Sequence, residues 1–529
     1  MTFGAKSLHI FNCLWQHGTL SVRRIAHTTG LSKSSVHRLQ QAMARRGRHP
    51  ESWLWETEEG RGWLLRLVVA TLYPFGLKRG VGLETISAFF VRLRLATQLG
   101  CAPSALRGVM QAVEAALLET AKAWEQDGCA SGEGRESIGA VDETFLERMM
   151  LVCMDLRTGY LLLEAAADDR TYATWKTLVE ERLTALGSEV RYMVSDRAKA
   201  LIQLAEKGLE CLSMPDCFHC LHELGKSYAL TIGQRLRHAH QALTTTKEAL
   251  AHHQGRPPLA RAARAAKTLV EEKQAEVTRW EEVRHTYRSP LETLALTLHP
   301  CRIADAVPQT SAQVESTLQA TVEALASFMQ HHQLPIRHNT LTQVRTQVPA
   351  LAALVDFWWE GVEQDLAQAT IAFSWRQWAR EFLLPWLYWA RQMAHTRCAR
   401  RKATIRQISE TVRAAFHTHA LTRQLPPQAL EDWCAWATQQ VQAFQRASSA
   451  VEGRNGVLAQ LHHNQRGLPK QRDKVWTILH NFDCQAPDGT TPAARFFRRS
   501  FPDLFETVVA QITDLPLPRQ RKHEIALNH

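Results

Sequence analysis

The chain has 529 residues and a mass of 59.9 kDa, more than one hydrophobic core usually supports, so we expect two to four domains. Apolar residues make up 45% and charged residues 22%, a balance that excludes wholesale disorder. The net charge of +11 and the sequence pI near 9.2 point to a polyanionic partner, with nucleic acid ahead of acidic lipid.

The sequence contains no segment with the length of a membrane helix. The longest apolar stretch, residues 382–390, falls far short of the roughly 18–20 residues that cross a bilayer. The N-terminal sequence lacks a basic segment followed by an apolar run and a small-residue cleavage site, so we expect no export. Eleven cysteines are scattered without a regular framework, as reduced thiols would be. These features predict a cytoplasmic protein.

Residues 1–50 form an electropositive segment with eight Lys or Arg and no Asp or Glu. Their apolar positions fit three short helices, with Gly30 as the break before the third helix and Ser32 as its cap. This pattern predicts a helix-turn-helix DNA-binding module; a basic three-helix bundle with a solvated face is the alternative. The residues predicted to bind DNA are Arg23, Arg24, Lys33, Ser34, Ser35, His37 and Arg38.

Residues 51–124 are predicted to form a second helical module. Within it, residues 86–113 repeat the helix, glycine, helix arrangement more weakly, with Gly100 as the break and Ser104 as the cap of another short helix. Core packing without DNA contact explains this pattern equally well. Residues 125–136 are rich in glycine and acidic residues, which predicts a linker.

Strand periodicity begins in residues 137–218. Three short apolar runs, 138–141, 149–154 and 160–165, predict a meander. Helix, strand, helix and strand patterns follow, so the predicted order is βββαβαβ. In a ribonuclease-H-like sheet, which has this order, acidic residues at the ends of the first and fourth strands come together. We therefore predict the first part of a ribonuclease-H-like α/β core.

Residues 219–445 have helical periodicity with almost no strand signal, which predicts an all-helical insertion. Its first two helices flank a GRPP turn at residues 255–258 and are expected to form an antiparallel hairpin. Tryptophans recur here at helical spacing, and we interpret most of them as core residues. Stacking on an unpaired base is the alternative for Trp375, Trp378 and Trp433, because polar residues flank them.

A basic cluster follows a tryptophan-rich helix of the insertion and is predicted to contact DNA, with a solvated face as the alternative. Its residues in this prediction are Arg400, Arg401 and Lys402. Residues 446–512 are expected to supply the second part of the core, with a catalytic glutamate helix and the C-terminal region, and residues 513–529 a basic tail. The predicted fold class is therefore multidomain α+β: N-terminal helix-turn-helix and a ribonuclease-H-like core interrupted by a large all-α insertion.

Three carboxylates are candidates for chemistry. Asp142 closes the first predicted strand and Asp196 the fourth, while Glu452 lies on a helix that returns to the sheet. Two-metal phosphoryl transfer needs such closely spaced carboxylates to hold two divalent ions about 3.5–4 Å apart. The alternative is that the aspartates cap helices and that Glu452 is simply exposed. Further residues expected near this site, where they would hold a phosphodiester backbone, are Arg454, Asn455 and His462.

The segment CFHCLH at residues 217–222 contains two cysteines and two histidines. A C-x-x-C pair invites zinc, but four ligands within one or two helical turns, without a distant second pair, make a poor structural site. We therefore interpret Cys217 and Cys220 as packing residues and keep zinc binding as the alternative.

Five motifs together resemble those of bacterial insertion-sequence transposases of the DDE class. The motifs are VDETF (141–145), VSDRAK (194–199), SSAVEGRNGVLAQLHHNQRGLP (448–469), HNFD (480–483) and DGTTPAARFF (488–497). The resemblance covers roughly residues 139–216 and 446–506, and more loosely the N-terminal module. The C-terminal stretch is its most specific part.

By that resemblance, Asp142, Asp196 and Glu452 are the ligands of two Mg²⁺ ions, for which Mn²⁺ can substitute, and His219 lies beside them as a contact to the scissile phosphate. The resemblance implies a transposase of the bacterial nucleoid that binds double-stranded DNA, without a membrane partner. It would cut the terminal inverted repeats of an element and join the freed 3′-OH to target DNA as a homodimer assembled on DNA. Two alternatives stay open: a catalytically silent transposase-derived DNA-binding regulator, and a ribonuclease-H-like nuclease without strand transfer.

Overall fold

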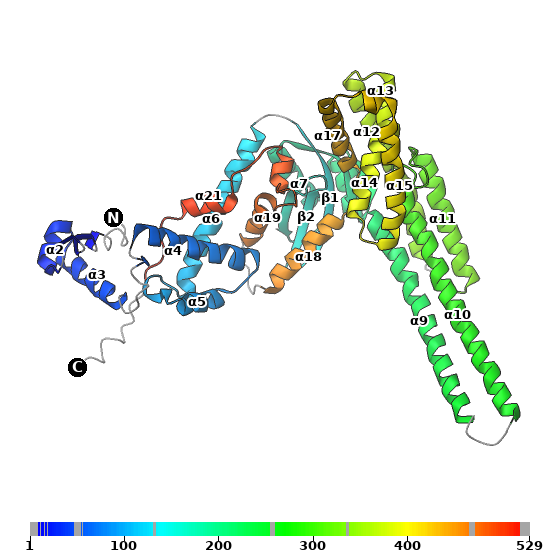
Figure 1. The fold of residues 1–529 in the computed structure, drawn as a ribbon, viewed down its shortest axis with the longest axis horizontal. Coiled ribbons are helices and arrows are strands. Elements are labelled where there is room, and N and C mark those ends of the chain that lie inside the picture. The colour runs from blue at the N-terminus through cyan, green and yellow to red at the C-terminus, as the bar shows by residue number, and fades with distance from the viewer. Residues whose placement is uncertain are drawn as a thin grey trace.

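The computed structural model describes a chain with an N-terminal helical domain, a body that contains one sheet, and a helical part with a long projecting hairpin (Figure 1). The described residues are 9–10, 12–14, 16–17, 19–46, 54–55, 57–130, 134–253, 260–334, 338–464 and 471–518. In these ranges no helix is both long and apolar enough to cross a membrane. The predicted multidomain α+β class is confirmed.

The N-terminal domain contains α2 (Val22–Thr29) and α3 (Lys33–Arg46), preceded by a short helical stretch. Gly30 ends α2 in the left-handed conformation, with φ of 67°, which a glycine adopts without steric cost. Ser32 Oγ accepts a hydrogen bond from the Ser35 N–H at 3.2 Å, so the predicted cap of α3 is confirmed. The domain has its own small core, made by Ile10, Ile25, Val36 and Leu39.

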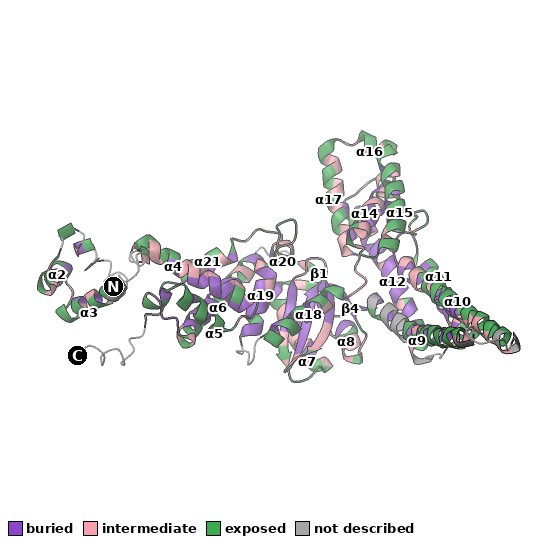
Figure 2. Cartoon of the chain, turned by 60° about the horizontal axis from the view of Figure 1, so that its bottom comes forward, coloured by how far each residue is buried: buried purple, intermediate pink, exposed green. Residues whose placement is uncertain are grey.

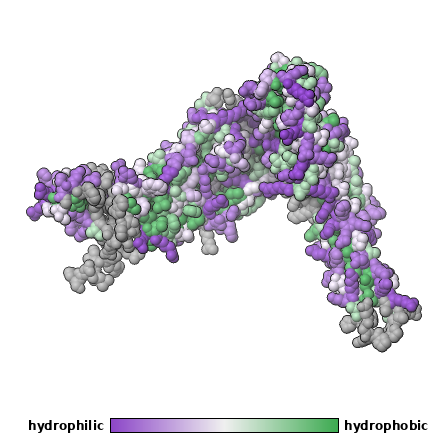
Figure 3. Space-filling view, viewed as in Figure 1, coloured by the Kyte–Doolittle hydropathy of each residue, from purple (hydrophilic) through white to green (hydrophobic). Residues whose placement is uncertain are grey.

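A second group of helices packs against the sheet-bearing body. Its elements are α4 (Glu58–Thr71), the π-helix η2 (Leu72–Lys78), α5 (Leu83–Arg92), the 3-10 helix η3 (Leu95–Thr97) and α6 (Pro103–Cys129). The prediction of a short helix capped by Ser104 is wrong, because α6 has 27 residues and starts at Pro103. Hydrophobic residues gather on the surface over α4 and α5 (Figure 3), where Phe89, Val91 and Leu93 are exposed.

A five-stranded mixed sheet forms the centre of the body. The strands are β1 (Arg135–Phe145), β2 (Met149–Asp155), β3 (Leu161–Ala167), β4 (Ser188–Ser195) and β5 (Leu212–Pro215), in the spatial order β3-β2-β1-β4-β5. The first three strands pair antiparallel, whereas β4 runs parallel to β1 and β5 parallel to β4. The connecting helices are α7 (Tyr172–Leu186), α8 (Lys199–Gln203) and the π-helix η4 (Leu204–Gly208). The predicted order βββαβαβ is confirmed.

The linker predicted at residues 125–136 is largely wrong, because α6 continues into this stretch and β1 begins within it. Glu125 accepts hydrogen bonds from Arg182 Nη2 at 2.7 Å and from the Tyr160 hydroxyl at 2.5 Å. The acidic residue that suggested a solvated linker is thus a partner of α7 and of the chain just before β3.

The described part of the insertion is helical apart from its connecting turns and one isolated β-bridge. Its helices are α9 (Cys217–His253), α10 (Ala260–Thr297), α11 (Ser311–His331), α12 (His338–Gln368), α13 (Phe373–Trp378), the π-helix η5 (Ala379–Leu383), α14 (Leu384–His395), α15 (Ala399–Thr418), α16 (Ala420–Gln424) and α17 (Pro427–Ala443). The packed helices α9 and α10 make the predicted hairpin; their turn lies outside the described residues. Buried residues gather in the sheet, α6 and α19, whereas most of α10 is exposed (Figure 2).

The tryptophans of the insertion are mainly core residues, as predicted for most of them. Trp378 is 1% exposed, and its Nε1–H donates to Thr422 Oγ1 at 2.9 Å. Trp375 and Trp433 are half-buried, with ring centroids 6.4 Å apart and planes nearly parallel. The expectation of exposure for Trp378 is wrong, because the helical period, and not the polarity of adjacent residues, decides which side chains face the core.

Four helices return the chain to the body: α18 (Ser449–Asn464), α19 (Arg472–Asp483), α20 (Pro492–Phe496) and α21 (Leu504–Gln511). Arg472 of α19 forms a buried ion pair with Glu114 of α6 at 2.5 Å. This ion pair joins a helix that follows the insertion to a helix that precedes the sheet. The Gly100 N–H donates to the Pro516 carbonyl at 2.7 Å, so the segment after α21 lies against η3. The cationic residues predicted for the tail, from residue 519, lie outside the described residues.

Candidate functional site

Asp142 and Asp196 lie side by side at one edge of the sheet. The parallel ladder of β1 and β4 ends with the pair Ala140 and Val194. Asp142 lies two residues after Ala140 within β1, and Asp196 lies two residues after Val194, directly after the end of β4. The prediction that Asp142 closes the first strand is wrong, because β1 continues to Phe145 with β2 as its only partner. The ladder between β1 and β4 therefore ends two residues before Asp142.

The electrostatics of this edge favour a cation. Burial raises the pKa of the Asp142 carboxyl above its ordinary value, and the nearby charges of Asp196 and Glu452 raise it further. A hydrogen bond from the Glu143 N–H at 2.9 Å and the charge of His219 act in the opposite direction. The net effect is a pKa of Asp142 above its ordinary value, with burial as the largest cause.

The helix α18 faces this edge with two polar side chains. Asn455 Nδ2–H donates to Asp142 Oδ2 at 2.8 Å, which joins the returning helix to β1. Glu452 is half-buried one turn earlier on the same side of the helix. Asn455 is 9% exposed, and within the described part of the chain its Oδ1 has no hydrogen-bond partner. Glu452 and Asn455 thus share the face of α18 that lies at this edge.

His219 reaches the same edge from the first turn of α9. Its Nδ1 lies 3.5 Å from Glu452 Oε1 and 4.0 Å from Asp216 Oδ2. In the described ranges, these three residues form the one group of potential metal ligands whose atoms all lie within 4.8 Å of one another. The two predicted aspartates, Asp142 and Asp196, do not belong to that tight group, although the charges of His219 and Glu452 act on Asp142.

Sequence reasoning missed Asp216. A signal for it was present, because MPD at the end of β5 repeats the pattern of VSD at the end of β4, with an acidic residue directly after a buried strand. Asp216 is 1% exposed, whereas Asp196 is exposed.

Arg454 does not contact this edge. Its guanidinium forms a buried ion pair with Glu164 of β3, with both N···O distances at 2.7 Å. The predicted DNA contact is wrong, because a residue two positions after Glu452 is rotated by about 200° around an α-helix. Thr477 of α19 also donates to Glu164, at 2.9 Å, so the pair fixes the rotation of α18.

His462 also lies away from the carboxylates, and its predicted place near the site is wrong. It follows Glu452 by about 15 Å along α18. Its ring lies against Trp476, with centroids 5.9 Å apart, and burial lowers the pKa of the imidazole.

The two cysteines of the CFHCLH segment are packing residues, as predicted. Cys217 and Cys220 line a small apolar cavity between α9 and its neighbours, with Leu294, Leu298, Leu318, Val344, Val348 and Leu351. Burial raises the pKa of the Cys220 thiol to about 12, so this thiol stays protonated at neutral pH. Neither cysteine belongs to the metal-ligand group within the described chain.

The helix-turn-helix geometry of the N-terminal domain agrees with a comparison to known families, in which residues 5–47 match the IclR helix-turn-helix domain. The chain carries an IclR-type helix-turn-helix domain. Residues 379–524 match a family of unknown function, DUF6399, and this match includes α18 with Glu452. A search of curated proteins found no match.

The IclR-type domain presents the predicted DNA-binding residues on its surface. Six of them are exposed, namely Arg23, Arg24, Lys33, Ser34, His37 and Arg38. Ser35 is half-buried, and its N–H donates to Ser32 Oγ, which caps α3. His37 Nε2 lies 3.0 Å from Gln41 Nε2, which orients the imidazole on α3.

The second predicted DNA contact lies in the first turns of α15, far along the chain from the IclR-type domain. Arg400 is exposed, with its Nε 3.3 Å from Glu292 Oε2, while Arg401 and Lys402 are half-buried. The ion pair with Glu292 reduces the charge that Arg400 offers to a phosphate. DNA binding by this cluster stays a prediction.

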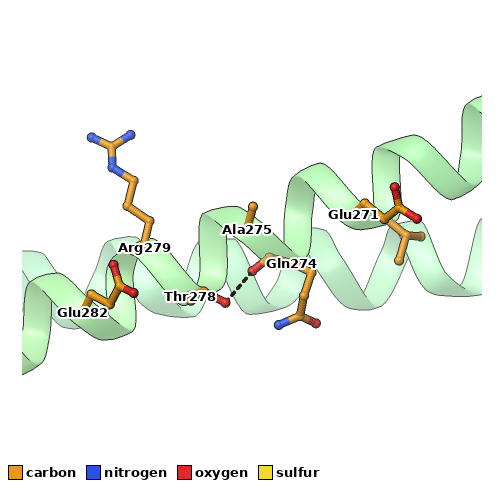
Figure 4. Close-up of a pocket in the computed structure, with 7 residues that line it drawn as sticks. Glu271, Gln274, Ala275, Thr278, Arg279 and Glu282 are labelled. Atoms are coloured by element: carbon orange, nitrogen blue, oxygen red, sulfur yellow. Dashed lines mark hydrogen bonds between the residues drawn. The ribbon is translucent and has the colours of Figure 1, made fainter.

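A shallow depression on α10 offers no comparable chemistry. Its lining comes from that one helix and includes Glu271, Gln274, Ala275, Thr278, Arg279 and Glu282 (Figure 4). The hydrogen bond drawn there joins Thr278 Oγ1 to the Gln274 carbonyl within the helix, at 3.1 Å. One face of one helix cannot enclose a ligand.

His480 of α19 predicts a pH dependence of stability. Burial, together with the charge of Arg454, lowers the pKa of His480 to about 4, and Nε2 lies 2.9 Å from the Gly159 carbonyl. An unfolded histidine titrates near pH 6.5, so stability present above that pH is lost as the pH falls toward 4. Between pH 7 and 4, the free energy of unfolding should fall by up to about 3 kcal/mol more in the wild type than in His480→Gln.

Urea unfolding followed by circular dichroism measures this difference. His238→Gln, which removes an exposed histidine of α9, is the control and should keep the wild-type pH slope. Equal slopes for the wild type and His480→Gln would contradict the prediction.

Proposed function

We propose that this protein is a DDE-type DNA transposase that cleaves element ends and joins them to target DNA by metal-dependent phosphoryl transfer. The observation that carries the proposal is the convergence of Asp142, Asp196 and Glu452 at one sheet edge, although 256 residues separate the last two. The strand order β3-β2-β1-β4-β5, with three antiparallel strands before two parallel ones, supports a ribonuclease-H-like core.

The side chains at this edge fit a pair of divalent cations. Carboxylate oxygens are the ligands that Mg²⁺ and Mn²⁺ prefer, and Asp142, Asp196 and Glu452 would hold the two ions. The buried Asn455 Oδ1, without a partner in the described chain, adds a polar oxygen to this set of carboxylates. When bound, the ions activate the attacking oxygen and stabilise the leaving oxygen.

Other residues of the site would orient these groups and the DNA. Asn455 holds Asp142 Oδ2 through one amide hydrogen bond and the Glu143 N–H holds Oδ1, so the carboxylate is fixed at both oxygens. His219 is half-exposed beside Glu452 and can donate a hydrogen bond to a phosphate oxygen. The IclR-type domain would bind the terminal repeats, and a homodimer would bring two ends together.

Full-length protein incubated with labelled element ends, Mg²⁺ and a target plasmid tests this function. Joined products would support a transposase. Cleavage without joining would favour the nuclease alternative, and binding without cleavage would favour the silent regulator.

The IclR-type domain predicts a specific salt dependence of DNA binding. Each phosphate contact contributes about 0.9 to the slope of log affinity against log salt concentration. Replacing the exposed Arg23, Arg24 and Lys33 together by Ala should therefore lower the slope by up to about 3 and abolish preference for element ends.

Fluorescence anisotropy at several salt concentrations measures this slope. A control variant, Arg237→Ala with Lys247→Ala, removes two exposed cations of α9 and should keep the preference for element ends. If the triple variant retains that preference, the domain does not recognise the ends.

A further inference from the structure

Asp216 is a buried carboxylate that joins the N-termini of two helices. It directly precedes α9, and its Oδ1 accepts a hydrogen bond from the His219 N–H at 3.4 Å, as a helix N-cap does. Its Oδ2 accepts from the Ser448 N–H at 3.3 Å and from the Ser448 hydroxyl. Ser448 is 5% exposed and Asp216 1% exposed, so the hydrogen bonds between these two residues are shielded from water.

Ser448 begins the helix that carries Glu452. Its carbonyl accepts the first backbone hydrogen bonds of α18, from the Val451 N–H at 2.8 Å and the Glu452 N–H at 3.2 Å. One carboxylate therefore fixes the start of α9, which carries His219, and the start of α18. The positive ends of two helix dipoles meet at this negative charge, which stabilises the arrangement.

A second contact closes the same junction. The Cys217 N–H donates to the Arg446 carbonyl at 3.0 Å, and Arg446 Nη1–H donates to the Leu298 carbonyl at 2.7 Å. The residues that flank the insertion on its two sides thus lie next to each other, and Asp216 and Ser448 are the sheet-side pair of this junction.

We propose that Asp216 is a positioning residue that sets the distance between His219 and Glu452, and that it is not a metal ligand. Three hydrogen bonds occupy its two oxygens, and a cation bound there would displace them. The role of Glu452 in this proposal rests on the proposed function. The hydrogen bonds that join Asp216 to α9 and to Ser448 can be tested without that function.

Two substitutions separate positioning from ligation. In Asp216→Asn, the amide oxygen can serve one helix, while the amide nitrogen cannot accept from the other. Ser448→Ala removes the hydroxyl donor and keeps the Asp216 carboxylate itself. If Asp216 positions Glu452, both variants weaken Mn²⁺ binding, by roughly tenfold or more for Asp216→Asn, as loss of a ligand's supporting hydrogen bonds does. If Asp216 is a ligand, Ser448→Ala leaves Mn²⁺ affinity unchanged.

Electron paramagnetic resonance of free Mn²⁺ measures the affinity, and amide hydrogen exchange of residues 449–455 measures the fixation of α18. Exchange at Val451 and Glu452 should accelerate about tenfold in Asp216→Asn. The control is Asp503→Asn, which alters the N-cap of α21 and should change neither quantity.

Wild-type Mn²⁺ affinity and exchange in a folded Asp216→Asn protein would overturn the proposal, as would an unchanged Ser448→Ala protein. If Asp216→Asn does not fold, the Mn²⁺ affinity and the amide exchange of Ser448→Ala decide between positioning and ligation. If the wild type does not bind Mn²⁺, the proposed function is contradicted. The exchange measurement still decides whether Asp216 fixes both helices.

Discussion

Asp142→Asn, Asp196→Asn and Glu452→Gln should each lower the rate of DNA strand cleavage by a factor on the order of a thousand. Each substitution removes one negative charge from a site whose contribution to the transition state is electrostatic. The fold should survive, because the amides are isosteric and the Asn455 side chain can rotate its Oδ1 toward a new amide at position 142. Cleavage of labelled element ends in Mg²⁺ measures the rate, and gel shift measures end binding.

End binding should stay near the wild-type level in all three variants, since the residues predicted to bind the ends lie in a domain with a separate core. Glu189→Gln is a matched control: it removes an exposed carboxylate from the opposite end of β4 and should cleave at the wild-type rate. If Glu452→Gln retains wild-type turnover, Glu452 is not the third ligand.

Glu164→Ala should lower the free energy of unfolding by about 3–5 kcal/mol. The substitution leaves the guanidinium of Arg454, whose side chain is 5% exposed, without its partner in a buried position. The double substitution Glu164→Leu with Arg454→Met should recover most of the stability, because it removes both charges and keeps apolar volume. Urea unfolding measures all three proteins.

The exposed pair of Arg302 and Asp305 provides the comparison. Asp305→Ala should cost less than about 1 kcal/mol, since water screens and solvates both partners. A cost for Glu164→Ala as small as that of Asp305→Ala would show that Arg454 finds another partner and that the pair does not fix α18.

The sheet could be predicted because its buried strands are continuous apolar runs between clear turns, and because parallel strands align the residues that follow them. Asp142 and Asp196 are therefore predictable from the sequence as neighbours. The extent of β1 was not predictable from apolar residues alone, since its last four residues are polar or exposed and pair only with β2.

The errors share a physical origin, which is that sequence distance does not give side-chain direction or long-range partners. Arg454 was assigned to the site by proximity to Glu452, yet helical rotation turns it toward Glu164. Composition suggested a linker around Glu125, which instead binds Arg182, 57 positions later. The pattern MPD marks the position of Asp216 at a strand end, but its role is not predictable, because its partner, Ser448, is 232 positions away.

The hydrogen bond between Asp142 and Asn455 spans 313 positions of the chain, and this separation has a consequence for synthesis. At about 5–20 residues per second, a ribosome needs roughly 15–60 seconds to proceed from the first of these residues to the second. During that interval the IclR-type domain is fully emerged, while the helix that brings Glu452 has not been made. A nascent polypeptide therefore carries a complete IclR-type domain before Asp142 has its partner Asn455 and before Glu452 has been added to the chain.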